Sequence, residues 1–537
     1  MASFANITIN NNISAVDKSS PWLTGCIDYR TPSLSKSGIE TLAELTDLRV
    51  SKIHGREPEI LLLQQAYENN QRDYPGFVII EGESGTGKSF LVSRALDELK
   101  KDRKICYMYG KFDLQRRVEP YSAIMAAFND LSCKIVSQED EKQLNSLRLM
   151  LKTEFGGQEK VLTNWNPNLD PLFHQKTIPE SDIICESNLG LIEERNRLLF
   201  LLRKFIRVIC QFYAPVFILF LDDLQWADTA SLDVLESLTT DRHNKNLLVI
   251  GTERKHDRED IGTIMKNIQA LGVSVDVIKL RDLNCSDLNH LLSDALRSEA
   301  DHTSKLAEIV HRKTNGNPFF VMQFLHSLRD KKILTFNLSL VQWQWNDKLA
   351  DELMQVTDNV SDLLRKMLLT LDLSEKLVLK VAACLGSRFS LRTLVIGLKS
   401  VHAVEQTLDV TNEKDIISTI ESLILMGLLE RLTTTDPQFR FVHDQILSSS
   451  YELIPSERKG FWNLAIGEAL LEKDKEDYDA GYLFLATDLC NGGLSLIGND
   501  VNKKDRIYHL NYRSGKKVSR YPPILSVYLA RNSLLLL

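Results

Sequence analysis

Apolar and polar residues begin to follow a regular period near residue 53. Residues 1–50 are rich in Ser, Asn and Thr and show little periodicity, which is typical of a flexible leader. Apolar positions over 57–67 then fall on one face of a helix, and residues 77–80 form an unbroken apolar run, which indicates a central parallel strand. A second helical pattern follows over 92–99. The periodic part of the chain therefore starts with a helix, and a strand, a glycine-containing loop and another helix follow.

Strands and helices continue to alternate as far as residue 250. Further strands are predicted at 105–109, 216–221 and 247–250. Helices are predicted at 121–131, at 198–212 and between the last two strands. Residues 133–190 are less regular and predict a helical insertion with loops. This order of elements predicts an α/β fold built on a doubly wound parallel sheet.

The second half of the chain is predominantly helical. Helical patterns occupy 284–330, 360–371 and 377–385. Two short β patterns, 428–432 and 439–442, flank a Thr/Asp/Pro turn and predict a hairpin, and helices followed by a hairpin favour a winged-helix domain. Residues 457–537 are predicted to be helical again.

These patterns divide the chain into five segments. We expect a flexible leader (1–50), an α/β core (51–283), a helical lid domain (284–354), a winged-helix domain (355–456) and a helical region (457–537). We expect the last region to be cut short, because the sequence stops at four leucines without a polar end.

Composition and charge narrow the classes of protein. Hydrophobic residues make up 43% and charged residues 26%, as in soluble globular proteins. The net charge of -7 argues against an extended surface for nucleic acid or an acidic membrane. Eight cysteines are scattered without a zinc-ligand spacing, so we expect reduced thiols and a cytoplasmic protein. No secretory signal is apparent, and the longest apolar stretch, 216–221, is too short to span a membrane.

The strongest chemical signal is a motif that fits G-x-x-x-x-G-K-[ST] between a predicted strand and helix. Its residues are Gly82, Glu83, Ser84, Gly85, Thr86, Gly87, Lys88 and Ser89. Glycines let backbone N–H groups surround phosphates, and the N-terminus of the helix adds partial positive charge. We expect Lys88 to reach the β- and γ-phosphates of ATP and Ser89 to ligate Mg2+. A chance match in a glycine-rich turn is the alternative, which the flanking strand and helix disfavour.

Two further groups follow later strands. Asp222 and Asp223 end the apolar strand 216–221; Asp222 is expected to bind magnesium, and Asp223 to polarise the attacking water. Paired acids are common in turns, so these two residues indicate a magnesium site only in combination with the P-loop. Arg254 follows the strand 247–250 and is either a phosphate sensor or a solvated loop arginine.

Four motifs in sequence are similar to those of a known family. They are Ile53-His54-Gly55-Arg56-Glu57, the P-loop, the stretch Phe220-Leu221-Asp222-Asp223-Leu224-Gln225-Trp226-Ala227-Asp228, and Asn315-Gly316-Asn317-Pro318-Phe319-Phe320. From about residue 50 onward the chain resembles predicted AAA-type ATPases of the STAND class (signal-transduction ATPases with numerous domains), in the branch fused to large sensor kinases. Because the sequence contains neither a kinase domain nor a full repeat array, we expect a fragment or a reduced member.

The resemblance implies roles for individual residues. Ile53, His54 and Arg56 would contact the adenine, and Pro318 would lie near the base. His443, in Val-His-Asp, resembles the winged-helix histidine that contacts the β-phosphate of ADP and locks a closed state. The alternative is a histidine that ends a strand and caps the next helix. Residues 457–537 resemble the opening helices of the family's superhelical repeats.

The resemblance favours a nucleotide-controlled switch. ADP would hold the domains together, and ATP would open them for protein partners or self-assembly, with slow hydrolysis as a reset. A DNA-associated winged-helix ATPase resembling origin-recognition proteins is the second hypothesis, against which stand the acidic charge and the lack of a Lys/Arg cluster over 428–445. A small-molecule kinase and a scaffold with structural nucleotide are further alternatives.

Overall fold

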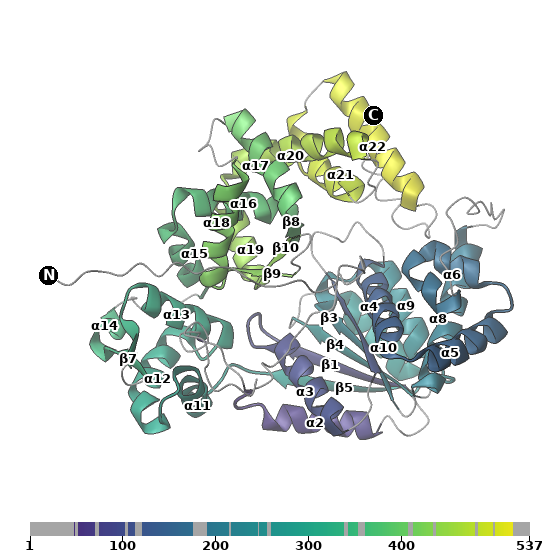
Figure 1. Cartoon of the computed structure of the whole chain (residues 1–537), viewed down its shortest axis with the longest axis horizontal. Helices are drawn as coiled ribbons and strands as arrows, with labels where there is room; N and C mark the ends of the chain where they lie inside the picture. The colour runs from purple at the N-terminus through teal and green to yellow at the C-terminus, as the bar shows by residue number, and fades with distance from the viewer. Residues whose placement is uncertain are drawn as a thin grey trace, which may run out of the picture.

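The structure is a computed structural model (Figure 1). It describes residue 48 and residues 52–69, 75–102, 106–112, 121–174, 191–213, 216–244, 246–254, 259–337, 342–352, 360–405, 412–432, 437–477, 482–497 and 500–518. The predicted leader therefore lies outside the described residues except for Leu48, as does the end of the last predicted region.

A five-stranded parallel sheet forms the first unit. Its strands are β1 (Gly76–Gly82), β2 (Cys106–Lys111), β3 (Phe217–Asp222), β4 (Leu247–Glu253) and β5 (Ser274–Leu280). They lie in the order β2-β3-β4-β1-β5, and each neighbouring pair is parallel. The predicted α/β class is confirmed. The edge strand β5 was not predicted from the sequence; only some of its side chains are buried.

Helices cover both faces of the sheet, because apolar residues of the strands alternate between two cores. The first core joins the sheet to α2 (Glu57–Asn69) and α3 (Lys88–Asp102). The second joins it to α4 (Ser122–Gln138), α8 (Leu191–Phe212), α9 (Thr229–Thr239) and α10 (Glu259–Ala270). Figure 1 shows α2 and α3 on the side of the sheet opposite α4 and α10.

The predicted helical insertion contains α5 (Glu141–Phe155), α6 (Glu159–Trp165), the 3-10 turn η2 (Pro167–Leu169) and α7 (Asp170–Phe173). Helix α4 continues to Gln138, so the insertion begins later than predicted. Its apolar residues join the core of the sheet through α8. The remainder of the predicted insertion, 175–190, lies outside the described residues.

The second unit, which we call the lid unit (284–352), has its own core. It contains α11 (Cys285–Leu296), α12 (Ala300–Thr314), α13 (Pro318–Asp330) and α14 (Asp347–Glu352). The helical pattern predicted for 284–330 is confirmed. The lid unit also contains an antiparallel hairpin that was not predicted, β6 (Leu334–Asn337) and β7 (Gln342–Trp345).

The third unit, the hairpin unit (360–452), combines helices with a small antiparallel sheet. Its helices are α15 (Val360–Thr370), α16 (Leu373–Leu385), α17 (Leu391–Glu405), α18 (Glu413–Leu425) and α19 (Asp444–Glu452). Its strands are β8 (Arg388–Ser390), β9 (Leu429–Arg431) and β10 (Gln438–Phe441), in the order β8-β10-β9. The predicted hairpin of β9 and β10 is present, and β8 adds a third strand that the sequence pattern did not reveal.

Helices follow the hairpin unit, as predicted: α20 (Ser456–Asp477), α21 (Leu483–Gly492), the 3-10 turn η6 (Leu494–Leu496) and α22 (Val501–Val518). Helix α20 packs on α17 and α21, so the hairpin unit and the final helices share apolar contacts. In the described part of the chain, no helix combines the length and hydropathy needed to cross a bilayer. The cysteines described there form no disulfide.

Candidate nucleotide-binding site

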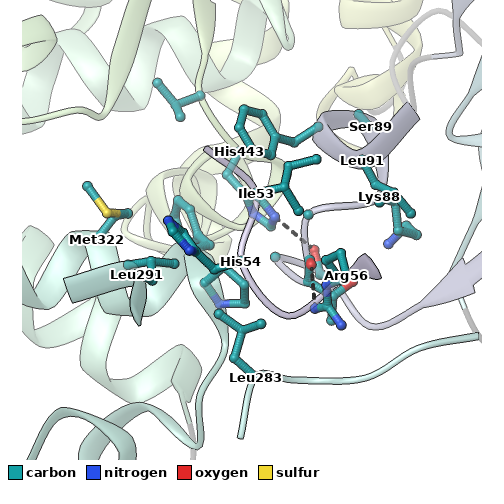
Figure 2. Close-up of a pocket in the computed structure, with 18 of the residues that line it drawn as sticks. Ile53, His54, Arg56, Lys88, Ser89, Leu91, Leu283, Leu291, Met322 and His443 are labelled. Atoms are coloured by element: carbon teal, nitrogen blue, oxygen red, sulfur yellow. Dashed lines mark hydrogen bonds between the residues drawn. The ribbon is translucent and has the colours of Figure 1, made fainter. Parts of the chain in front are cut away.

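A cavity of about 540 Å³ lies where the sheet, the lid unit and the hairpin unit meet (Figure 2). Its volume is in the range of pockets that hold nucleotide-sized ligands. It is lined by these predicted site residues: Ile53, His54, Arg56, Ser84, Gly85, Thr86, Gly87, Lys88, Ser89, Asp223, Arg254, Pro318 and His443. The other predicted residues, Gly82, Glu83 and Asp222, do not line the cavity but are hydrogen-bonded to Lys88 or Ser89, which do. The fold therefore brings together residues that are far apart in the sequence.

The predicted phosphate loop connects β1 to α3. Gly85 and Gly87 have φ of 87° and 91°, values that favour glycine. A Cβ on Gly85 would also lie 2.5 Å from Asn317 Oδ1 of the lid unit. Lys88 Nζ donates to the carbonyl oxygens of Gly82 and Glu83, each at 2.9 Å, so its ammonium is held against the loop. Burial lowers the pKa of Lys88, and the carboxylates of Asp223 and Asp222 oppose that change.

Behind the loop, hydroxyl groups surround Asp222. Ser89 Oγ donates to Asp222 Oδ1 at 2.7 Å, and Thr252 Oγ1 donates to the same oxygen at 2.6 Å. Among the described residues, no cluster of three or more His, Cys, Asp or Glu residues is present that could hold a metal alone. Magnesium bound with a nucleotide needs only one or two protein oxygens, because phosphates and water supply the rest. The adjacent hydroxyl and carboxylate of Ser89 and Asp222 fit that requirement.

Asp223 has a left-handed backbone, with φ of 60°. Its Oδ1 accepts from Gln225 Nε2 at 2.9 Å, and its Oδ2 lies 2.8 Å from Lys111 Nζ. Burial opposes ionisation of Asp223, but the Lys111 ammonium and the hydrogen bonds lower its pKa below the usual range. The same contact matters for Lys111: burial opposes its charge, yet Asp223 and Asp222 raise the pKa of Lys111 well above its usual value. Both side chains are therefore charged at neutral pH.

Arg254 follows β4 and points across the cavity to the hairpin unit. Its guanidinium donates to Asp444 Oδ2 at 3.1 Å and lies 5.5 Å from the centre of the Trp226 ring. The backbone N–H of Arg254 donates to Gln225 Oε1 at 3.2 Å. Its side chain is 21% exposed. Of the two hypotheses for Arg254, the freely solvated loop arginine does not fit this geometry, and phosphate sensing stays a prediction.

His443 joins all three units. Its Nδ1 accepts from the backbone N–H of Gln445 at 3.2 Å, so the imidazole caps α19. With Nδ1 as the acceptor, Nε2 carries the proton and faces Ser84 Oγ in the phosphate loop at 3.3 Å. The ring also stacks on Phe319 of the lid unit, with centroids 4.2 Å apart. Burial, together with the positive charge of Arg254, lowers the pKa of His443 to about 3, so the ring is neutral.

The opposite end of the cavity is less charged. Figure 2 shows Leu283, Leu291 and Met322 on the side away from Lys88 and Ser89. His54 Nε2 lies 3.3 Å from Asp294 Oδ2, which links the segment before α2 to the lid unit.

Arg56 also lines the cavity, but its hydrogen bonds go to backbone carbonyl oxygens of the chain. It donates to the carbonyl oxygens of Thr86 at 3.2 Å and Arg281 at 2.6 Å, and it is 7% exposed. In this structure Arg56 therefore braces the phosphate loop against the chain that leads into the lid unit.

The main residue that sequence reasoning missed is Lys111. The predicted strand 105–109 ended two residues before it, although a lysine at the carboxyl end of a parallel strand lies at the edge where sites form. Asn317 was also given no role, yet its Nδ2 donates to Ser84 O at 3.0 Å and to Asp282 Oδ1 at 3.1 Å. Asp444 was quoted within a motif, but its pairing with Arg254 needed the structure.

Part of the chain is similar to a known protein family. Residues 52–250 match the family profile described as AAA ATPase domain. That segment of the chain is therefore an AAA ATPase domain, a class of nucleotide-binding P-loop domains. The match includes β1, the phosphate loop, β3 and most of β4.

A curated relative of larger size is also found. The chain is 24% identical over 525 residues to hybrid signal transduction histidine kinase G of Dictyostelium discoideum, and the match covers 79% of this chain. The chain spans only 14% of the length of that curated relative.

Solved structures with related folds have low identity. A STAND protein with a tetratricopeptide repeat sensor from Pyrococcus horikoshii has 17% identity and a TM-score of 0.43, with 93% of this chain and 59% of that chain covered. The ORC2 protein of Aeropyrum pernix has 10% identity and a TM-score of 0.37, with coverage of 76% and 97%. The Cdc6p protein of Pyrobaculum aerophilum has 13% identity and a TM-score of 0.34, with coverage of 76% and 96%.

Proposed function

We propose that the chain is a STAND-type signalling switch that binds ATP or ADP with Mg2+ and hydrolyses ATP slowly. The observation that carries this proposal is the position of His443. One side chain of the hairpin unit contacts Ser84 of the phosphate loop and stacks on Phe319 of the lid unit. A change of nucleotide at the phosphate loop would thus act directly on the contact that holds three units together.

The second contact between these units supports a difference between ADP and ATP. Arg254 is bound to Asp444, the residue after His443. A γ-phosphate would compete with the Asp444 carboxylate for the Arg254 guanidinium, since both are anions that accept from the same donors. ADP lacks that group and would leave the pair intact. ATP would therefore favour release of the hairpin unit, which is the differential contact that a switch requires.

The remaining residues divide the work of binding and hydrolysis. Lys88 and the backbone N–H groups of 82–89 bind the phosphates, while Ser89 and Asp222 hold the magnesium ion. Magnesium, when bound, neutralises charge on the phosphates. Asp223 orients the attacking water. Ile53, His54, Arg56 and Pro318 are proposed to surround the base.

We propose protein partners or self-assembly as the output, in the cytoplasm. The alternative, a DNA-associated winged-helix ATPase, finds little support in the hairpin. Its arginines are paired with acids: Arg440 lies 2.8 Å from Glu430, and Arg431 lies 3.6 Å from Glu421. Paired arginines have less free charge to offer to DNA phosphates. We also propose that residues 360–452 form a winged helix that serves as the moving unit of the switch.

The first experiment identifies the nucleotide that copurifies with the protein, by denaturation and chromatography. Stoichiometric ADP is expected in the wild type. His443→Ala should retain less ADP, because it loses the hydrogen bond to Ser84 and the stack on Phe319. Val404→Ala is the control, because Val404 is an exposed residue of the same unit that does not line the cavity.

The switch also predicts a change of shape. Exchange of ADP for a non-hydrolysable ATP analogue should expand the molecule or promote assembly, as measured by small-angle scattering and light scattering. The proposal fails if the purified protein holds no nucleotide, turns over magnesium ATP quickly and keeps the same shape and assembly state. That result would favour a plain ATPase or a kinase.

A further inference from the structure

Lys111 occupies the centre of the acidic part of the site. It is the last residue of β2, and the parallel register places it beside Asp222 at the end of β3. The backbone N–H of Phe112 donates to Asp222 O at 3.0 Å, which fixes the end of β2 against β3. The Lys111 side chain is 27% exposed and lines the cavity. The fold therefore holds a positive charge beside the two acids that were assigned to magnesium and water.

Each oxygen of the two carboxylates contacts a polar group of the chain itself. Lys111 Nζ lies 2.8 Å from Asp223 Oδ2 and 3.8 Å from Asp222 Oδ2. The other oxygen of Asp223 accepts from Gln225, and the other oxygen of Asp222 accepts from Ser89 and Thr252. The side chain of Asp222 is 1% exposed and that of Asp223 is 11% exposed. Two adjacent, buried carboxylates need a compensating cation, and Lys111 supplies it within the chain.

We propose that Lys111 is an internal counter-ion for the Asp222–Asp223 pair, which lets the site hold a nucleoside diphosphate without magnesium. In this arrangement Lys111 is a positioning residue. It keeps Asp223 hydrogen-bonded to an ammonium group instead of a water molecule. Hydrolysis then requires Lys111 to leave Asp223 when magnesium and the γ-phosphate arrive. The inference deepens the proposed function and rests on the nucleotide binding proposed there.

The charges at this end of the cavity explain why the effect should be visible. Asp222, Asp223 and Asp444 face Lys88, Lys111 and Arg254, so the group is balanced before any ligand arrives. Removal of Lys111 leaves an excess of negative charge beside the loop that binds phosphates. A diphosphate would then be repelled unless magnesium restores the balance.

The experiment measures the affinity of a fluorescent ADP analogue by anisotropy, once with excess EDTA and once with excess magnesium. For the wild type, the two dissociation constants should agree within about threefold. For Lys111→Met, affinity in EDTA should fall at least about tenfold, the scale expected when one member of a close charge pair is lost. Its affinity in magnesium should remain within about threefold of the wild type. Lys111→Arg, which keeps the charge, should restore binding in EDTA.

Lys134→Met is the matched control. Lys134 also forms an ion pair beside β2, at 2.6 Å from Asp130, but it does not line the cavity. Its substitution should leave the ratio of the two dissociation constants unchanged.

Three results would overturn the role of Lys111. The first is a wild type whose dissociation constant in EDTA exceeds that in magnesium more than about tenfold. The others are a Lys111→Met protein with the same ratio of dissociation constants as the wild type, and a Lys111→Arg protein that does not regain binding in EDTA. If Lys111→Met does not fold, the proposal is tested by the wild type alone, through the ratio of its dissociation constants in EDTA and in magnesium. Absence of binding by the wild type in both buffers contradicts the proposed nucleotide binding itself, and is thereby distinguished from failure of the Lys111 proposal alone.

Discussion

The two ends of the cavity are built on different principles. At the phosphate end, charged side chains are held by short bonds to the sheet and the phosphate loop, such as Lys88 to Gly82 O at 2.9 Å and Lys111 to Asp223 at 2.8 Å. At the other end, the walls are mainly apolar residues of the lid unit, including Leu291 and Met322. Charged contacts depend on position within a fraction of an ångström, whereas apolar contacts depend on volume and area.

This difference means that the two ends should fail in different ways. Loss of the Lys88 charge at the phosphate end should weaken every phosphate-containing ligand. A change of volume at the apolar end should weaken only ligands that carry a base. Pyrophosphate, which has no base, separates the two effects experimentally.

The largest effect is expected for Lys88→Ala. The substitution removes the ammonium that is bound to the loop carbonyls and proposed to bind phosphate. ADP affinity, measured by calorimetry, should fall about 100-fold, in the range measured when a buried charge loses its partner. Lys52→Ala is the control, because Lys52 lines the same cavity but is exposed and lies outside the phosphate loop. Equal losses for both lysines would contradict the distinction between the two ends.

The phosphate end was also the easier part to predict from sequence. The phosphate loop is a local motif: Gly85 and Gly87 are needed because of their positive φ, and the strand and helix on either side are visible as apolar patterns. Asp222 and Asp223 could be placed because Asp222 ends a fully buried strand and Asp223 follows it directly. Such features need no knowledge of the tertiary structure.

Contacts between distant segments could not be predicted in the same way. The role of Lys111 depends on β2 lying next to β3. The order of strands in a sheet cannot be predicted from the local pattern of apolar residues. The edge strand β5 was missed because several of its side chains, including Val277, face solvent and give no buried run. The alternation in β7, Gln342–Trp345, is a strand pattern that was overlooked inside a helical region. The bond between Arg254 and Asp444 joins residues 190 positions apart.

A smaller effect is expected from filling the apolar end. Met322→Trp adds volume to a wall of the cavity and should lower ADP affinity about tenfold through overpacking. Pyrophosphate affinity should remain unchanged. Met322→Leu, which conserves volume, is the control and should bind ADP like the wild type. If pyrophosphate and ADP weaken equally in Met322→Trp, the two ends are not independent.

The ion pair across the cavity should have a smaller effect still. Arg254 and Asp444 are 21% and 26% exposed, so their interaction is worth about 1 kcal/mol or less. Arg254→Gln and Asp444→Asn should each speed ADP dissociation about threefold in stopped-flow measurements, and the double variant should be no faster.

Arg458→Gln serves as the control for that cycle. Arg458 forms a somewhat shorter ion pair with Glu405, at 2.8 Å compared with 3.1 Å for Arg254 and Asp444, between helices outside the cavity. Its loss should leave the rate of ADP dissociation unchanged. Additive effects of the Arg254 and Asp444 variants would show that these residues act separately.

A separate effect, on stability and not on binding, is the pH dependence that His443 gives to the closed arrangement. Its pKa is about 3 in the structure, compared with 6.5 for an ordinary histidine, so the folded state resists its protonation. Stability is therefore complete above pH 6.5 and decreases as the pH falls toward 3, by at most about 1.4 kcal/mol per unit. The positive charges of Arg254, Lys111 and Lys88 also lower the pKa of His443, whereas the negative charge of Asp223 raises it.

When the pH is lowered from 7 to 5.5, the free energy of unfolding of the nucleotide-free wild type should fall by about 1 kcal/mol more than that of His443→Gln. In calorimetry this corresponds to about 2 °C in Tm. His326, in α13 of the lid unit, has its pKa lowered to about 4 by burial and by Arg329, so it contributes with the same sign in both proteins. His326→Gln should therefore also reduce the dependence of the free energy of unfolding on pH, and its effect should add to that of His443→Gln. Equal slopes for the wild type and His443→Gln would mean that the imidazole is solvated, and that the link between the hairpin unit and the phosphate loop is not maintained in solution.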